Sequence, residues 1–305
     1  MKQFLSYILV TVFMTALVLE VVLRVFQLSS HAVPSEIINN NYVNKPYAEA
    51  IWVKGGLGEI KAHYKINPQG YNSLKDYSKI SKDKYRIAIM GDSYIEGLQV
   101  NVENSIGRIL EKQMNDRVEV HEYGVSGANI IDYGLLYQKY IKDNYDIVFI
   151  HLKDDDLLQD LAGNVGRVDK KIKITRARKI YNNYYTARYL NINHGVGEKL
   201  SKIIKGETFS KRGDNVSSKR VNDRIENSIN RKALTMLDSS VVILYEKGKL
   251  TPFLFEKFSF EKAKIKHDAL PKDFGFDIHW NFNGRVNCAK TIEKYLLERQ
   301  KNLKQ

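Results

Sequence analysis

The stretch RIAIMGDSYIEGLQV, residues 86–100, joins a short apolar segment to a turn that carries a hydroxyl group. The apolar and partly β-branched residues 87–90 are typical of a strand that is covered on both faces. The turn that follows offers Ser93 between an acid and two glycines. In open α/β sheets, ligands bind at the carboxyl ends of the strands. Ser93 is therefore a candidate functional residue.

An alternation of strand-like and helix-like segments begins at Tyr85. The expected strands are residues 85–90, 118–123, 146–152 and 241–245, and the expected helices are residues 104–115, 129–143 and about 283–303. Strands that alternate with helices form a parallel sheet with helices on both faces. The sequence therefore predicts a three-layer α/β/α sandwich with a central parallel sheet.

Composition limits the possible classes of protein. A chain of 305 residues holds one large or two modest domains. Its single cysteine, Cys288, excludes an intrachain disulfide. The glycine-rich phosphate-binding patterns G-x-G-x-x-G and G-x-x-x-x-G-K are absent, which argues against a cytosolic flavodoxin-like binding protein. Ligand spacing typical of a metal site is absent as well, so we expect neither a metal nor a cofactor.

The N-terminal segment is uncharged from Phe4 to Leu19, and its apolar pattern continues to Phe26. A helix over residues 4–26 would be about 35 Å long, enough to span a bilayer with some tilt. We expect an uncleaved membrane anchor that places the rest of the chain outside the cytoplasm, in the periplasm or at the cell surface. A cleaved signal peptide is the alternative, because Ser30-His31-Ala32 has small residues at the required spacing.

The rest of the chain divides into three further parts. With the anchor over residues 1–27, we expect a polar linker and small cap over 28–83, and an α/β domain over 84–305 with a basic insertion at about 161–220. Lys and Arg outnumber Asp and Glu by 48 to 35 in the whole chain. Residues 167–220 alone hold fifteen Lys or Arg against four Asp or Glu. This span is either a solvated insertion or a surface for anionic polymer or lipid headgroups, and a nucleic acid is not expected outside the membrane.

Three later segments reach the same edge of the predicted sheet as Ser93. Residues 123–130, YGVSGANI, follow a strand and open a helix, and Gly127 there can turn its backbone N–H toward a ligand. Residues 276–284, FDIHWNFNG, place Asp277 two residues before His279. A serine needs a base to become a nucleophile, and the base needs an orienting acid. The third segment, residues 151–160, begins with His151, which we expect to be packed within a strand.

With these motifs the chain resembles the SGNH/GDSL hydrolases, and more closely their membrane-anchored bacterial branch, which includes alginate-type O-acetyltransferases. GDSYIEGLQV resembles the first block of the family, and YGVSGANI resembles the second. DIHWNFNG resembles the last block, and YKINPQGYNS, residues 64–73, resembles a segment that precedes the first. The resemblance implies that Ser93 is the nucleophile, His279 its base and Asp277 the partner of the base. It also implies that the N–H groups of Ser93 and Gly127 form an oxyanion hole.

The third block departs from the family pattern. Its asparagine normally donates into the oxyanion hole, whereas Asp155 stands at that position within the run Asp154-Asp155-Asp156. An ionised carboxylate cannot donate a hydrogen bond and would repel an oxyanion. Three alternatives stay open: the hole uses the Ser93 and Gly127 N–H groups, Asp155 is protonated by burial, or the site is impaired. Lys153 either neutralises the aspartate run or faces solvent.

These observations predict an extracytoplasmic serine ester hydrolase that acts on O-acyl esters through an acyl-Ser93 intermediate. An acylated glycan of the cell envelope is the expected substrate. The alternatives are an O-acyltransferase that moves the acyl group to a polysaccharide, and a non-catalytic binding or assembly module that keeps the fold. The aspartate run favours the last alternative.

Overall fold

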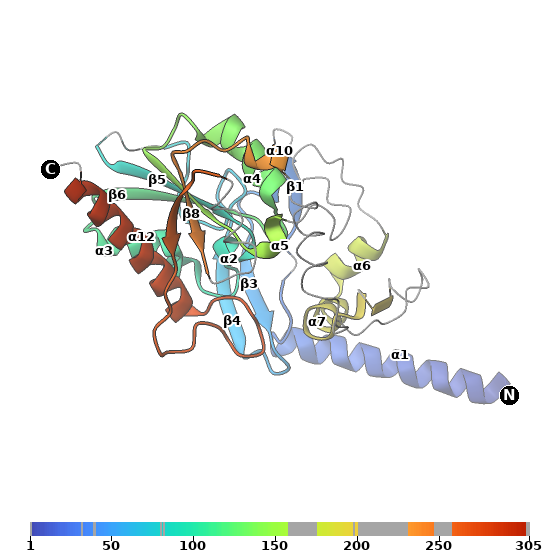
Figure 1. Cartoon of the computed structure of the whole chain (residues 1–305). Helices are drawn as coiled ribbons and strands as arrows, with labels where there is room; N and C mark the ends of the chain where they lie inside the picture. Colours follow the sequence, from blue (N-terminus) through green and yellow to red (C-terminus); the bar gives the residue numbers. More distant parts are fainter. Residues whose placement is uncertain are drawn as a thin grey trace, which may run out of the picture. The chain divides into compact units, whose positions relative to one another are not determined.

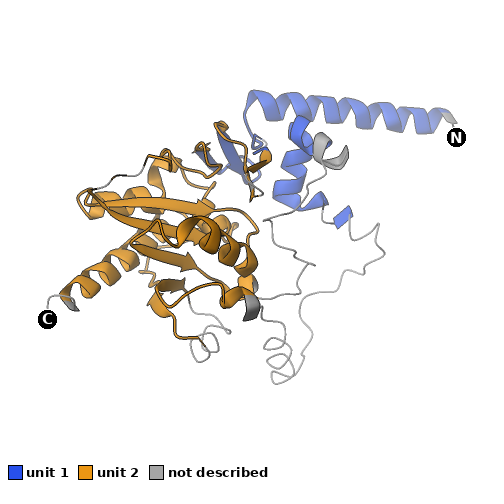
Figure 2. Cartoon of the chain, turned by 90° about the horizontal axis from the view of Figure 1, so that it is seen from above, with its two compact units in different colours: residues 1–34, 50–63, 172–215 blue, residues 35–49, 64–171, 216–305 orange. Residues whose placement is uncertain are grey.

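The computed structural model describes residues 2–31, 33–38, 41–79, 81, 83–157, 176–197, 199–200, 231–246 and 258–302. The chain divides into two compact units, each assembled from three stretches (Figure 2). Unit 1 comprises residues 1–34, 50–63 and 172–215, and unit 2 comprises residues 35–49, 64–171 and 216–305. The predicted boundaries at residues 27 and 83 stay a prediction. Much of the basic span 161–220 lies outside the described residues.

Unit 2 contains a five-stranded sheet. Its strands are β5 (Tyr85–Gly91), β6 (Val118–Gly124), β7 (Ile147–His151), β8 (Val241–Tyr245) and β9 (Glu261–Lys264). They lie in the order β6-β5-β7-β8-β9, and every neighbouring pair is parallel. This is the flavodoxin-like order, in which the first strand lies at the point where the strand order reverses. The predicted parallel sheet is confirmed, and β9 is an addition to the four expected strands.

Helices cover both faces of this sheet (Figure 1). Apolar side chains of α3 (Ile106–Gln113) and α12 (Phe282–Asn302) pack on one face with Ile87, Ile89 and Phe149. On the other face, α4 (Ile130–Leu136) and α10 (Arg231–Leu234) pack with Ala88 and Ile150. Successive residues from 87 to 90 point to opposite faces of the sheet. Because helices cover both faces, all four of these residues are apolar. The predicted three-layer α/β/α sandwich is therefore confirmed.

Short elements complete the sandwich. They are α2 (Ser93–Glu96), the 3₁₀ turn η1 (Val102–Asn104), the π-helical turn η2 (Tyr137–Ile141) and α5 (Asp154–Leu157). The expected helix over 129–143 is thus an α-helix followed by a π-helical turn. Unit 2 also holds the antiparallel pair β1 (Ser35–Ile38) and β2 (Asn41–Asn44) from the predicted cap region.

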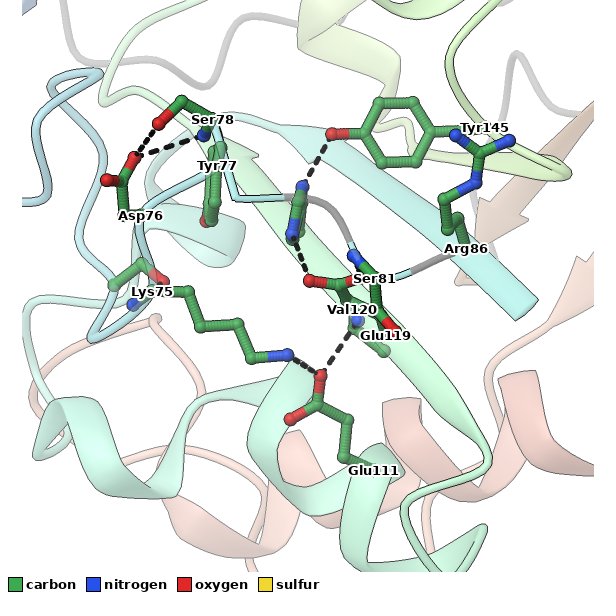
Figure 3. A network of polar contacts seen from close by, with 12 residues as sticks. Lys75, Asp76, Tyr77, Ser78, Ser81, Arg86, Glu111, Glu119, Val120 and Tyr145 are labelled. Carbon is green, nitrogen blue, oxygen red and sulfur yellow. Dashed lines mark hydrogen bonds and ion pairs between the residues drawn. The ribbon is translucent and has the colours of Figure 1, made fainter. Parts of the chain in front are cut away.

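The edge strand β6 is buried along its whole length. The segment before β5 covers it, and Figure 3 shows side chains at this contact. The Tyr77 hydroxyl donates to the Glu122 carbonyl at 3.0 Å and accepts from the Glu122 N–H at 2.9 Å. The Ser81 N–H donates to Glu119 at 2.8 Å. Side chains and turns therefore take the place of a further strand, which protects an edge that could pair with another chain.

Unit 1 contains α1 (Lys2–Val25), the paired strands β3 (Glu49–Lys54) and β4 (Ile60–Lys65) for most of their length, α6 (Arg176–Asn183) and α7 (Tyr185–His194). Within residues 3–25 of α1, an 18-residue window has a mean hydropathy of 2.3, and 6% of that window is buried. By length and composition this helix could cross a membrane or serve as a signal sequence.

The carboxyl end of α1 makes polar contacts with α7. The Glu20 carboxylate accepts hydrogen bonds from the N–H groups of Tyr185 and Thr186 at 3.1 and 2.8 Å, and from the Thr186 hydroxyl at 2.9 Å. Arg24 pairs with Glu20 and lies over the Tyr185 ring, 4.5 Å from its centroid. A carboxylate at the first N–H groups of a helix satisfies donors that have no partner within the helix.

Candidate active site

Ser93 lies where β5 ends and α2 begins, and its side chain is half-buried. Asp92 caps this short helix, because its carboxylate accepts from the Tyr94 N–H at 3.0 Å. Gly97 closes the helix with a φ of 62°, a backbone conformation that favours glycine. Asp92 and Gly97 thus fix the two ends of the single helical turn that contains Ser93. This turn presents Ser93 at the carboxyl edge of the sheet.

His279 and Asp277 meet Ser93 from the loop that connects β9 to α12. The His279 Nε2 atom lies 2.9 Å from Ser93 Oγ, and its Nδ1 atom lies 2.5 Å from Asp277 Oδ1. The same Asp277 oxygen accepts from the His279 backbone N–H at 3.0 Å. The spacing of two residues therefore lets one carboxylate orient both the backbone and the ring of His279. The Asp277 side chain is fully buried, whereas that of His279 is 19% exposed.

The hydrogen bonds define the tautomer of a neutral His279 ring. A carboxylate is only an acceptor, so the contact with Asp277 places the ring proton on Nδ1. The Nε2 atom is then the acceptor for the Ser93 hydroxyl. This is the arrangement in which an imidazole can remove a proton from a serine. The structure thus brings together three of the predicted site residues, Ser93, Asp277 and His279.

Glu246 holds the loop that carries His279, and sequence reasoning missed it. It follows β8, and its carboxylate accepts from the Trp280 indole N–H at 2.9 Å and pairs with Lys272. Burial opposes ionisation of Glu246, but its hydrogen bond to Lys272 and the charge of Lys272 outweigh burial and lower its pKa. The motif HWN contains Trp280 but gives no indication of Glu246, because Glu246 lies 34 residues earlier in the chain.

Tyr94 supports the same loop from the side of α2. Its hydroxyl donates to the Ile278 carbonyl at 2.8 Å, and its ring lies 5.2 Å from the ring of His279. Burial raises the pKa of Tyr94, and the nearby Asp92 carboxylate raises it further. The hydroxyl therefore stays protonated and keeps donating across the neutral pH range.

The turn that holds Gly127 follows β6. Gly127 is exposed and has a φ of 73°. Within the described part of the chain, neither its N–H nor the N–H of Ser93 donates to another group. Both groups are therefore free to bind an oxyanion, as the family resemblance implies. Their roles in such a site stay a prediction.

The third block differs from the expectation for Lys153. Asp155 lies in α5, directly after β7, and its side chain is outside the described residues. The Lys153 ammonium lies 2.6 Å from an Asp92 carboxylate oxygen and 4.4 Å from the centroid of the Tyr94 ring. This side chain therefore pairs with the acid that precedes Ser93. We expected Lys153 either to neutralise the aspartate run or to face solvent, and the contact with Asp92 is neither of these.

His151 is packed, as predicted. It is 0% exposed and its ring lies 4.7 Å from the ring of Trp280. Burial lowers the pKa of His151 to about 4, so its ring is neutral at pH 7. His151 therefore supports the site as a packing residue beneath Tyr94 and Trp280.

Within the described ranges, no three His, Cys, Asp or Glu side chains form a group that could hold a metal ion. Around Ser93 the site offers a hydroxyl, an imidazole, a carboxylate and two free backbone N–H groups. This set suits acyl transfer to and from a serine.

Comparisons with known proteins give structural similarity alone. No family model matches the sequence, and no curated protein matches it either. A carbohydrate acetylesterase family member from Sinorhizobium meliloti has a TM-score of 0.34 and 10% identity, covering 70% of this chain and 97% of that chain. A lipolytic protein of the G-D-S-L family from Veillonella parvula has a TM-score of 0.34 and 11% identity, covering 69% and 97%.

A third similar structure is a lipase from a goat rumen metagenome, with a TM-score of 0.33 and 13% identity, covering 69% of this chain and 97% of that chain. The identities and TM-scores are low, so the chemistry must be argued from the side chains of this chain. The membrane-anchored branch of the family stays a prediction.

Proposed function

We propose that this protein is a serine ester hydrolase of the SGNH/GDSL type. The observation that carries the proposal is the continuous line of contacts from Ser93 Oγ to His279 Nε2 at 2.9 Å and from His279 Nδ1 to Asp277 at 2.5 Å. These residues come from segments almost 190 positions apart. Their order along the chain matches the first and last blocks of the family.

The chemistry proceeds in two halves. In the first, Ser93 Oγ bonds to the ester carbonyl carbon while its proton moves to His279 Nε2. The carbonyl oxygen becomes an oxyanion, which the N–H groups of Ser93 and Gly127 stabilise. The bond to the alcohol oxygen then breaks, and His279 returns the proton to that oxygen. Asp277 stabilises the imidazolium that forms between these steps.

In the second half, water attacks the acyl-Ser93 ester and gives its proton to His279. The acid is released, and the proton returns to Ser93 Oγ. A sugar hydroxyl in place of water would complete acyl transfer to a polysaccharide by the same steps. We propose hydrolysis because Ser93 is half-buried rather than closed off from water.

The proposed substrate is an O-acyl ester of a cell-envelope glycan, met in the periplasm or at the cell surface. Support comes from α1, whose residues 3–25 are apolar and largely exposed. Contacts within unit 1 support retention of this helix. Ser30 is 0% exposed, and its hydroxyl pairs with the backbone N–H and carbonyl of Val53, both at 2.7 Å. Cleavage at the predicted signal site would remove Ser30 from this unit.

The test uses the full chain in detergent, with an aryl acetate as substrate and a fluorophosphonate as a serine probe. The wild type should hydrolyse the ester and become labelled at Ser93. Ser93→Ala should abolish both, and His279→Ala should lower both by at least about 10³-fold. His194→Ala, a histidine in α7, is the matched control and should leave both unchanged. A wild type that neither hydrolyses esters nor reacts with the probe would refute the proposal.

A non-catalytic binding module is the second candidate, and one observation favours it. Asp155 replaces the neutral donor of the family pattern, and α5 places it directly beyond β7. Binding of an acylated glycan to the wild type, together with no reaction at Ser93, would support this candidate.

A further inference from the structure

Glu96 links the helix of the nucleophile to the turn of the second oxyanion donor. It is the last residue of α2, three positions after Ser93, and it is 5% exposed. One carboxylate oxygen accepts from the Ser126 N–H at 3.1 Å and from the Ser126 hydroxyl. Ser126 immediately precedes Gly127. A single side chain therefore connects the two segments that carry the free N–H groups.

The other groups of Glu96 are bound as well. Its second carboxylate oxygen accepts from the Asn44 amide at 2.7 Å. Its backbone carbonyl accepts from the Asn72 amide at 2.9 Å. Asn72 belongs to the segment YKINPQGYNS, residues 64–73, which resembles a segment that precedes the first block of the family. These contacts bind the Glu96 side chain and backbone in addition to Ser126, so its carboxylate has a fixed position.

The backbones of α2 and the end of β6 also meet directly. A Cβ atom at Gly124 would lie 2.0 Å from the Glu96 nitrogen and 2.4 Å from the Ile95 carbonyl carbon, which real Cβ atoms do not tolerate. The Val125 N–H donates to the Gly91 carbonyl at 3.2 Å. This close approach needs a glycine at position 124, and Glu96 binds the turn that follows it through Ser126.

We infer that Glu96 is a positioning residue that sets the place of the Gly127 N–H relative to the Ser93 N–H. The inference rests on the proposed ester hydrolase function and adds a residue to it. Oxyanion donors act only within a few tenths of an ångström of the productive geometry. If the third donor is absent because of Asp155, catalysis depends on these two N–H groups and hence on Glu96.

The variants for the test are Glu96→Ala, Glu96→Gln and a matched control. Glu111 offers the control, since it is also a buried carboxylate, 2% exposed, that accepts from a backbone N–H, that of Val120 at 2.8 Å. It lies on α3 and pairs with Lys75 in the network of Figure 3. Glu111→Ala should therefore reproduce the loss of a buried carboxylate without any effect on the oxyanion donors.

Steady-state kinetics on the aryl acetate give the first readout. Glu96→Ala should lower kcat by about 10- to 100-fold, with KM unchanged, because a displaced donor weakens only the transition state. The acid limb of the pH profile should stay in place, since His279 and Asp277 are untouched. Glu96→Gln should keep most of kcat, because its amide oxygen still accepts from Ser126. Glu111→Ala should keep kcat. Equal kcat in Glu96→Ala and wild type would overturn the inference.

Backbone amide exchange gives a second readout that needs no activity. Exchange over residues 125–128, measured by mass spectrometry, should quicken in Glu96→Ala and stay unchanged in Glu111→Ala. Unchanged exchange in Glu96→Ala would overturn the inference even if the enzyme is active. Failure of the proposed function looks different: the wild type itself would neither turn over the ester nor label at Ser93.

Discussion

The candidate catalytic residues Ser93, Asp277 and His279 have supports both close in sequence and far away. The motifs GDS and DIH each contain a candidate side chain and its nearest support, Asp92 for the turn of Ser93 and Asp277 for His279. Glu246 carries no such signal, since its partner Trp280 is distant in sequence. The pairing of Lys153 with Asp92 was also missed, because it depends on the approach of two strand ends.

The first prediction concerns Asp155. If the oxyanion hole lacks a donor, Asp155→Asn should supply one and raise kcat for an aryl ester by up to about 10²-fold. Asp154→Asn makes the same change in charge one residue earlier and should have little effect. Ser93→Ala combined with Asp155→Asn should remove the gain. A kcat that is unchanged in Asp155→Asn would show that the hole already works with its two N–H groups.

The second prediction concerns the acid stability set by His151. Burial lowers the pKa of His151 to about 4, whereas an exposed histidine titrates near 6.5. Between these values the unfolded chain binds more protons than the folded one, so the free energy of unfolding decreases as the pH falls. The expected contribution is a loss of about 2 kcal/mol between pH 7 and pH 5.

His151→Leu should remove this part of the pH dependence. Thermal unfolding in detergent at pH 5 and pH 7 measures it, and the variant should show a smaller decrease of Tm than the wild type. His63→Leu, at an exposed position in β4, is the control and should retain the full decrease. Equal decreases in wild type and His151→Leu would show that His151 is protonated without cost in the folded protein.

At the scale of elements, the buried strands were predictable and the covering segments were not. The stretches that became β5, β6, β7 and β8 are apolar or alternate regularly, and all four were placed within two residues. The strand β9 has the sequence Glu-Lys-Ala-Lys, in which one residue of four is buried, so no apolar pattern marks it. The segment that covers β6 binds it through polar groups of Tyr77 and Ser81, and their partners in β6 lie about 40 residues later in the chain.

The third prediction tests this cover. Tyr77→Phe removes the hydroxyl that binds both the N–H and the carbonyl of Glu122, and it leaves two buried backbone groups without that partner. An unsatisfied buried polar group costs about 1–3 kcal/mol, so Tm should fall by several degrees. Tyr47→Phe, at a side chain that is 77% exposed, should leave Tm unchanged. An unchanged Tm in Tyr77→Phe would mean that water replaces the hydroxyl and that the cover is not required.

At the scale of the whole molecule, each compact unit combines stretches that are far apart in the chain. The sequence suggested an anchor, a cap and an α/β domain in succession. In the structure, unit 1 combines the N-terminal helix with β-strands from the expected cap and helices from the basic insertion. Such a unit cannot be inferred from local composition, because its contacts join residues about 160 positions apart.

The last prediction follows from these contacts within unit 1. Arg188 is 2% exposed, and its guanidinium donates to the Ser30 carbonyl at 2.6 Å. Cleavage after Ala32 would remove both Ser30 and Glu20, and it would leave the Arg188 charge and the first N–H groups of α7 without these partners. A buried charge that loses a partner is strongly destabilising. We therefore expect the mature protein to keep its N-terminus.

Tags at both ends of the chain measure this directly. Both should be found on one polypeptide in the membrane fraction, released by detergent and not by high salt. A chain that begins at Val33 should lose protease resistance over residues 185–194, whereas a chain shortened only before Phe4 should keep it, because Glu20 and Ser30 remain. A mature protein without the N-terminal tag would establish a cleaved signal peptide. In that case Arg188 and Thr186 must find other partners, and proteolysis of the α7 region in the cleaved protein would show whether they do.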